Sequence, residues 1–399
     1  MDNKEKIIKA EELLKVNKQE NVLNFFRKLS EDKQIKLAEQ ITNLNFEQLN
    51  KLYAETKETP EISEKKITHI KYVDEYKLSD EDQEKYTKLG EDIIKNNQYA
   101  VVIMAGGQGT RLGFKGPKGT YKLQVGKNGK YIFEILIETL KKSKEKYGIL
   151  PYLYIMTSMQ NNDETINFFK EHNFFEYDQN KVKFFKQGKL PMLTENGKMV
   201  IENDEIKTGS DGNGGVYVAM KKQGIIEDMK SKNVKWVYIC GVDNIMVEPI
   251  APVFIGATIK KNLQIASKSV AKAYPGEKVG VFCKKNGKPG IVEYIELSDE
   301  MKEKRDENGE LVFGEANFIS HLLSLEAIEK ISNYDLKFHI AKKNGLYKFE
   351  TFIFDAFEFF DDMLVMRVKR EEEFAPIKNK EGVDSPETAV KLYENKIKN

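Results

Sequence analysis

A cluster of glycines, together with one arginine and several lysines, follows directly after an apolar run near residue 100. The stretch at 101–123 reads VVIMAGGQGTRLGFKGPKGTYKL and contains Arg111 and Lys118. Glycines let backbone N–H groups reach anionic oxygens because no Cβ stands in the way. An apolar strand, a glycine-rich loop and positive side chains in this order therefore indicate a site that binds phosphates.

Two widespread phosphate-binding motifs do not fit this stretch. A P-loop requires GxxxxGK[ST], and no register of the segment matches it. A dinucleotide-binding fingerprint requires GxGxxG, whereas Gly107, Gly109 and Gly113 give GxGxxxG. The phosphate site is therefore of another type.

The stretch resembles the GGxGTRLG…PKG loop of the eukaryotic-type UDP-sugar pyrophosphorylases, above all their UDP-N-acetylhexosamine (UDP-N-acetylglucosamine) branch. Further segments similar to motifs of this family follow in the same order. They are FFKQGKLP (184–191), SDGNGG (210–215), CGVDN (240–244), EKVGVF (277–282), IVEYIEL (291–297), ANFISH (316–321), KFETFIFDAF (348–357) and EEEFAPIKN (371–379). The resemblance thus extends over most of the chain.

The resemblance implies a uridylyltransferase that makes UDP-sugar and pyrophosphate from UTP and a hexose-1-phosphate. N-acetylglucosamine-1-phosphate is the expected acceptor, and glucose-1-phosphate or galactose-1-phosphate is the alternative. The four histidines include no pair two residues apart, which disfavours a histidine-nucleophile transferase of the HxH kind. We therefore expect direct in-line attack on the α-phosphate, for which positioning and charge neutralisation suffice. A non-catalytic nucleotide-sugar-binding regulator is the alternative outside this class.

The family motifs assign residues to the UTP side of the reaction. The expected catalytic, phosphate-contacting residues are Arg111, Lys118 and Lys378. The expected nucleotide-binding residues are Met104, Ala105, Gly106, Gly107, Gln187, Gly212, Asn213 and Lys348. A glutamine amide offers one donor and one acceptor, as a uracil edge requires. In a chain so rich in lysine, solvated surface bases are the alternative for the lysines.

Asp243 follows an apolar strand, where a doubly wound sheet presents its ligand site. A carboxylate at this position suits Mg²⁺ that bridges phosphates, which we expect as the cofactor. The alternative is a helix N-cap for the next segment.

For the sugar side, the resemblance implies Gly280, Glu293, Tyr294, Asn317, Phe352 and Phe354. We expect the two phenylalanines, two residues apart on a strand, to point to one face, although that face could also be packed core. Ser210 and Ser320 stand where the family has a proline and an asparagine. Ser210 affects the loop at 210–215, and Ser320 replaces one expected sugar contact.

Composition limits the possible partners. The 399 residues carry 64 basic and 63 acidic side chains, a formal net charge of +1. This balance provides no field for nucleic acid or anionic membrane, so we expect neither, and no protein partner is implied. Cys240 and Cys283 lack CxxC or CxxH neighbours, and the N-terminus lacks the apolar core of a signal peptide. We therefore expect a cytoplasmic protein.

The elements that must position these residues follow from the pattern of the chain. Apolar runs alternate with amphipathic helices from residue 99, which predicts an α/β fold with a Rossmann-like mixed, mostly parallel sheet of nucleotide-sugar transferase type. Expected strands are 99–105, 151–158, 182–188 and 234–244; expected helices are 131–148, 163–172 and 215–230. The expected regions are an N-terminal helical region (1–98), a catalytic domain (99–370, with a UTP half 99–250 and a sugar half 251–370) and a C-terminal segment (371–399).

Overall fold

The computed structural model describes residues 2–58 and 66–398. The chain divides into two compact units. The first consists of residues 1–64, 188–215 and 336–353, and the second of 65–187, 216–335 and 354–399. The two units are defined by packing, and each combines several separate stretches of the chain. The expected regions were defined by the order of the motifs along the sequence, and they remain a prediction about function.

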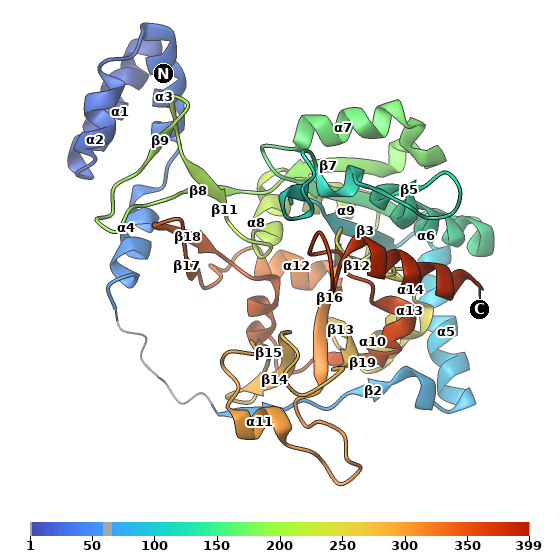
Figure 1. Ribbon diagram of the computed structural model, residues 1–399. Helices are drawn as coiled ribbons and strands as arrows, with labels where there is room; N and C mark the ends of the chain where they lie inside the picture. The colour runs from blue at the N-terminus through green and yellow to red at the C-terminus, as the bar shows by residue number, and fades with distance from the viewer. Residues whose placement is uncertain (1, 59–65, 399) are drawn as a thin grey trace. The chain divides into compact units, whose positions relative to one another are not determined.

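The second unit is built on a mixed sheet whose main path runs β2–β19–β13–β16–β12–β3–β6–β7 (Figure 1). Its strands are β2 (Val73–Asp74), β19 (Leu364–Val368), β13 (Ile265–Ala271), β16 (Glu315–Ser324), β12 (Trp236–Gly241), β3 (Tyr99–Met104), β6 (Tyr152–Thr157) and β7 (Val182–Lys186). A side branch contains β1 (Ile67–His69), β14 (Val281–Lys285) and β15 (Lys288–Val292). The expected mixed, mostly parallel sheet is confirmed.

Strands β12, β3, β6 and β7 are parallel neighbours, and β16 runs antiparallel between β12 and β13. Strands β3, β6 and β12 are buried along almost their whole length, as expected for strands covered on both faces, whereas the edge strand β7 carries Lys183 and Lys186. Their carboxyl ends, Met104, Thr157, Lys186 and Gly241, therefore lie at one edge of the sheet. Ligands of doubly wound sheets bind at this edge.

Helices pack on the sheet of the second unit. They are α5 (Asp80–Lys95), α6 (Ile132–Tyr147), α7 (Asn162–Glu171), α8 (Gly215–Lys222), α9 (Ile225–Ser231), α10 (Pro252–Lys260), α11 (Asp299–Glu303), α12 (Leu325–Ile331), α13 (Arg370–Glu373) and α14 (Pro386–Lys398). The single helix expected over 215–230 is wrong: Gly224, with φ of 68°, separates α8 from α9. A left-handed residue cannot continue a right-handed helix, and glycine adopts this conformation at little cost.

The first unit joins the N-terminal helices to later hairpins. Its helices are α1 (Asn3–Val16), α2 (Glu20–Phe26), α3 (Glu31–Thr42) and α4 (Phe46–Glu55). Its hairpins are β8 (Lys189–Pro191) with β11 (Thr208–Ser210), β9 (Ile201–Glu202) with β10 (Glu205–Ile206), and β17 (His339–Lys343) with β18 (Leu346–Glu350). Phe26, Ile41 and Leu49 form one core with Met199 and Phe349. The helical region thus buries its apolar face against segments distant in sequence.

Four consecutive residues after α7 adopt left-handed backbone conformations. The φ angles of Asn173, Phe174, Phe175 and Glu176 are 47°, 50°, 52° and 60°. For residues with a Cβ this conformation is unfavourable. The rings of Phe174 and Phe175 each pack against Phe169, with centroids 5.9 and 5.7 Å apart. This aromatic packing holds the turn in place.

We expect Glu176→Gly to stabilise the protein by about 1 kcal/mol, because glycine adopts the left-handed conformation without the Cβ penalty. Little is lost with the side chain, since its ion pair with Lys141 (3.0 Å) is largely exposed. Chemical denaturation measures the free energy of unfolding. Asn167→Gly, at an exposed position in the middle of α7, is the control and should cost stability, because glycine is unfavourable inside a helix. A Glu176→Gly variant no more stable than the parent would contradict the interpretation.

Among the described residues, no helix combines the length and the apolar character needed to cross a membrane.

Candidate active site

The glycine-rich segment forms a compact loop directly after β3. Two backbone hydrogen bonds close it, from Gly109 N to Gly116 O (2.9 Å) and from Lys118 N to Gly107 O (3.1 Å). Gly113 takes a φ of 71° at the end of a short 3₁₀ helix, where the chain reverses. The loop therefore holds Lys118 beside the carboxyl end of β3.

Gly106 lies against the side chain of Gln187. A Cβ at Gly106 would lie 2.5 Å from Oε1 of Gln187, so any side chain there would displace the Gln187 amide. Gln187 follows β7 and is itself fixed by a hydrogen bond from its N–H to the carbonyl of Thr157 (2.7 Å). The structure thus brings two predicted nucleotide-binding residues together at the carboxyl edge of the sheet.

We expect Gly106→Ala to raise the KM for UTP roughly tenfold or more, because the added methyl group displaces the Gln187 amide from its position. Steady-state kinetics at saturating sugar phosphate provide the measurement. Gly276→Ala is a matched control, since a Cβ there would meet only Tyr274, at 3.9 Å. An unchanged KM in Gly106→Ala would show that the position of Gln187 has no part in UTP binding.

Three charged residues predicted for the phosphate site, Arg111, Asp243 and Lys378, lie within electrostatic range of Lys118. Burial lowers the pKa of the Lys118 ammonium; the Asp243 carboxylate opposes this shift, whereas Arg111 and Lys378 add to it. Three segments distant in sequence therefore meet at Lys118. Three cations concentrated in this way are suited to the negative charge of a triphosphate.

The backbone of Asp243 is hydrogen-bonded to that of Ile377, the residue before Lys378. The segment after β12 pairs with residues 374–377, and Ile377 N donates to the carbonyl oxygen of Asp243 (2.8 Å). The Lys378 ammonium lies 3.5 Å from the Asp384 carboxylate. Lys378 is thereby brought to the carboxyl end of β12.

The expected Mg²⁺ site depends on the Asp243 carboxylate. Across residues 2–58 and 66–398, no group of three or more His, Cys, Asp or Glu side chains could enclose a metal ion. Mg²⁺ is often held by only one or two carboxylates together with substrate phosphates, and the surroundings of Asp243 fit this arrangement. Asp243 would hold such an ion only together with the nucleotide.

Three of the predicted sugar residues meet in the second unit. Asn317 N donates to the carbonyl of Gly280 (2.9 Å), and a Cβ at Gly280 would lie 3.0 Å from Oε1 of Glu293. Tyr294 follows in the turn after β15. Phe354 is buried in a 3₁₀ helix over Ile353–Phe359.

The first unit holds the other predicted contacts. The backbone of Gly212 has a φ of 89° and lies against the backbone of Thr351, so that a Cβ would clash. Asn213 Oδ1 accepts a hydrogen bond from Ile353 N (2.9 Å). Lys348 forms an ion pair with Glu350 (2.7 Å), which a phosphate would have to displace.

The expectation that Phe352 and Phe354 share a strand is wrong. Strand β18 ends at Glu350, and the chain then turns into the 3₁₀ helix. The DGNGG segment causes this turn, because the hydrogen bonds from Thr351 N to Asp211 O and from Gly214 N to Thr351 O replace the pairing of the hairpin. Spacing by two therefore does not place the rings on one face.

The sequence of this chain is similar to those of known proteins over most of its length. The family described as UTP–glucose-1-phosphate uridylyltransferase matches residues 43–384. The chain belongs to this family. It is 35% identical over 412 residues to UDP-N-acetylglucosamine diphosphorylase 2 of Arabidopsis thaliana, covering 95% of this chain and 81% of the relative. It is 35% identical over 342 residues to the UDP-N-acetylglucosamine pyrophosphorylase of Saccharomyces cerevisiae, with coverages of 78% and 71%.

A solved structure agrees with these relatives. The uridine diphosphate N-acetylglucosamine pyrophosphorylase of Trypanosoma brucei, solved with an inhibitor, superposes with a TM-score of 0.82 at 28% identity. The alignment covers 97% of this chain and 84% of that one. This uridylyltransferase therefore shares both sequence and fold with UDP-sugar pyrophosphorylases.

Sequence reasoning missed a buried residue that supports the glycine loop of this uridylyltransferase. The Asn161 side chain is fully buried, and its Nδ2 donates to the carbonyl of Ala105 (3.0 Å). Its Oδ1 accepts a hydrogen bond from Ser158 N (2.7 Å). A polar pair, Asn161 and Asn162, between a strand and a helix was the available signal.

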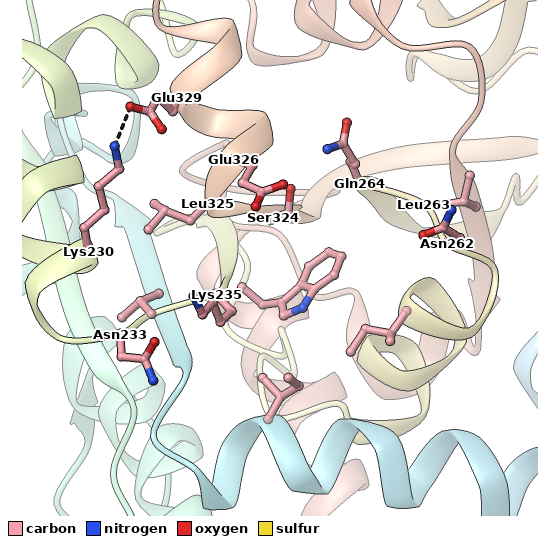
Figure 2. Close-up of a pocket in the computed structure, with 14 residues that line it drawn as sticks. Lys230, Asn233, Lys235, Asn262, Leu263, Gln264, Ser324, Leu325, Glu326 and Glu329 are labelled. Atoms are coloured by element: carbon pink, nitrogen blue, oxygen red, sulfur yellow. Dashed lines mark hydrogen bonds and ion pairs between the residues drawn. The ribbon is translucent and has the colours of Figure 1, made fainter.

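A cavity of about 680 Å³ opens elsewhere in the second unit (Figure 2). Residues around the starts of β12 and β13 line it, including Lys235, Asn262 and Gln264, and the ion pair of Lys230 with Glu329 lies at its margin. None of the predicted site residues lines this cavity. It lies at the amino ends of the strands, away from the glycine loop, and we assign it no part in uridylyl transfer.

Proposed function

We propose that this uridylyltransferase uses N-acetylglucosamine-1-phosphate as its preferred acceptor and Mg²⁺ as its cofactor. The observation that carries the proposed Mg²⁺-assisted transfer is that Asp243 and Lys378 lie within electrostatic range of Lys118, which lies in the same loop after β3 as Arg111. The names of the relatives from Arabidopsis, yeast and Trypanosoma support the acceptor.

In the proposed reaction, a phosphate oxygen of the sugar phosphate attacks the α-phosphorus of UTP. The new P–O bond forms as the bond to the β-phosphate oxygen breaks, and pyrophosphate leaves in line with the attack. Lys118, Arg111 and Lys378 neutralise the charge that grows on the leaving group. Mg²⁺ held by Asp243 and the phosphates would supply further charge stabilisation.

Binding of the two substrates follows from the remaining residues. Gln187 would pair with the uracil edge through its amide. The Oδ1 of Asn317 accepts a hydrogen bond from Ile319 N (3.0 Å), which orients the amide and leaves its Nδ2 as the donor that Asn317 can offer to a sugar. An N–H donor suits the acetamido carbonyl of an N-acetylated sugar. Such a donor is compatible with an N-acetylated sugar, and the names of the relatives favour N-acetylglucosamine-1-phosphate over glucose-1-phosphate or galactose-1-phosphate.

The test is pyrophosphate release from UTP and Mg²⁺ with one sugar phosphate at a time. The panel contains the 1-phosphates of N-acetylglucosamine, N-acetylgalactosamine, glucose and galactose. We expect the highest kcat/KM with N-acetylglucosamine-1-phosphate. A higher value with glucose-1-phosphate would overturn the acceptor assignment, and no release with any sugar, while UTP still binds, would overturn the reaction.

A further inference from the structure

Asn244, next to the predicted magnesium ligand, is a buried amide whose side chain joins two segments of the chain. It is 4% exposed. Its Oδ1 accepts hydrogen bonds from Ala375 N (2.9 Å) and Met246 N (3.3 Å), and its Nδ2 donates to the carbonyl of Glu373 (2.7 Å). The amide thus contacts the segment after β12 and the segment that leads to Lys378.

A buried ion pair anchors the start of that second segment. The ammonium of Lys268 in β13 lies 2.7 Å from both carboxylate oxygens of Glu373 and 3.0 Å from the carbonyl of Glu248. The two side chains are 2% and 10% exposed. Breaking such a pair would leave an unpaired charge in the interior, which is strongly destabilising. The Glu373 carboxylate is therefore held in place by its two hydrogen bonds from Lys268. Glu373 therefore presents its carbonyl to Asn244 from a fixed position.

Between Glu373 and Lys378, the chain follows the segment after β12. Ile245 N donates to Ala375 O (3.4 Å), and Ile377 N donates to Asp243 O (2.8 Å). Lys378 is the next residue. Any displacement of residues 373–377 therefore moves the Lys378 backbone relative to Asp243.

We propose that Asn244, supported by the Lys268–Glu373 pair, is a positioning residue that fixes the Lys378 ammonium relative to Asp243 and the phosphates. This inference rests on the proposed function, because Lys378 must contact a phosphate for its position to matter. An amide is required at Asn244 because the same side chain must accept from Ala375 N and donate to Glu373 O. A carboxylate could only accept.

The test is a double-mutant cycle with Asn244→Asp and Lys378→Ala in the full chain, read as kcat for pyrophosphate release. Asn244→Asp alone should lower kcat on the order of tenfold, because a small misplacement of a positioned group is costly. In the Lys378→Ala background, the same substitution should change kcat less than about twofold, because the group it positions is gone. A purely structural role would lower kcat equally in both backgrounds.

The other outcomes of the cycle separate a failure of the positioning role of Asn244 from a failure of the proposed function. Equal losses in both backgrounds overturn the positioning role and leave the proposed function intact. Full activity of Lys378→Ala overturns both the phosphate role of Lys378 and the inference that depends on it. If Asn244→Asp does not fold, Asn244→Ser enters the same cycle with the same expected outcomes, because its shorter hydroxyl cannot span the distance between Ala375 N and Glu373 O.

Asn97→Asp provides a matched control at the amino edge of the sheet. The Nδ2 of Asn97 donates to the Tyr152 hydroxyl (2.8 Å), and its Oδ1 accepts from Lys181 Nζ (2.9 Å). The same chemical change there should leave kcat unchanged, because Asn97 precedes β3 at the end opposite to the glycine loop. A loss of kcat equal to that of Asn244→Asp would overturn the positioning role.

Discussion

Lys118→Met is expected to make the free protein more resistant to heat while removing most of its uridylyl-transfer activity. Burial lowers the pKa of Lys118, and Arg111 and Lys378 lower it further, although Asp243 acts in the opposite direction. At neutral pH the folded state therefore bears the cost of a charged group that the unfolded chain keeps in water. Methionine retains the apolar stem of the side chain without that charge.

The gain in stability from Lys118→Met should decrease as the pH rises. A depressed folded-state pKa lowers the stability of the parent at every pH below it, and the deficit disappears above the unfolded value of about 10.4. The advantage of Lys118→Met should therefore be largest at neutral pH and should shrink in alkaline solution. Thermal unfolding across this range measures it.

The same substitution should lower kcat/KM for UTP on the order of a hundredfold or more, the scale for loss of one group that stabilises a developing anion. Lys115→Met, at an exposed position of the same loop, is the matched control and should retain activity. A Lys118→Met variant with normal turnover would remove this lysine from the phosphate site. A lower Tm would show instead that its charge stabilises the fold.

Asp243→Asn is expected to abolish most Mg²⁺-dependent turnover, by about a hundredfold or more, with the fold intact. The amide has nearly the same shape as the carboxylate, and the backbone carbonyl of residue 243 still accepts from Ile377 N. What is lost is the negative charge that would hold the cation among Arg111, Lys118 and Lys378. Steady-state kinetics over a Mg²⁺ titration, together with thermal unfolding, provide the measurement.

Asp228→Asn is the contrasting control for this substitution. The Asp228 carboxylate accepts from Tyr154 (2.7 Å) and forms an ion pair with Lys232 (2.9 Å), which together lower its pKa against the opposing effect of burial. Its replacement should cost stability and leave the Mg²⁺ dependence unchanged. Activity of Asp243→Asn within a few-fold of the parent would show that the metal is held elsewhere.

The sequence by itself determined the features that depend on local pattern. Apolar runs such as 99–105 predicted the buried parallel strands, since strands covered on both faces need apolar side chains throughout. The glycines after that run predicted the loop, because its backbone requires residues without a Cβ. Collinear motifs predicted the family and the reaction, and Gly106 and Gln187 do lie together as the nucleotide assignment requires.

Only the tertiary structure decided how distant segments meet. Nothing in the spacing of Arg111, Asp243 and Lys378 indicates that their charges act on one lysine. That follows from the parallel order of β12 and β3 and from the pairing of residues 374–377 with the end of β12. Packing also decided against the strand expected at 352–354. Hydrogen bonds between segments far apart in sequence outweighed the local alternation there, and a pattern read along one segment contains no information about its partner.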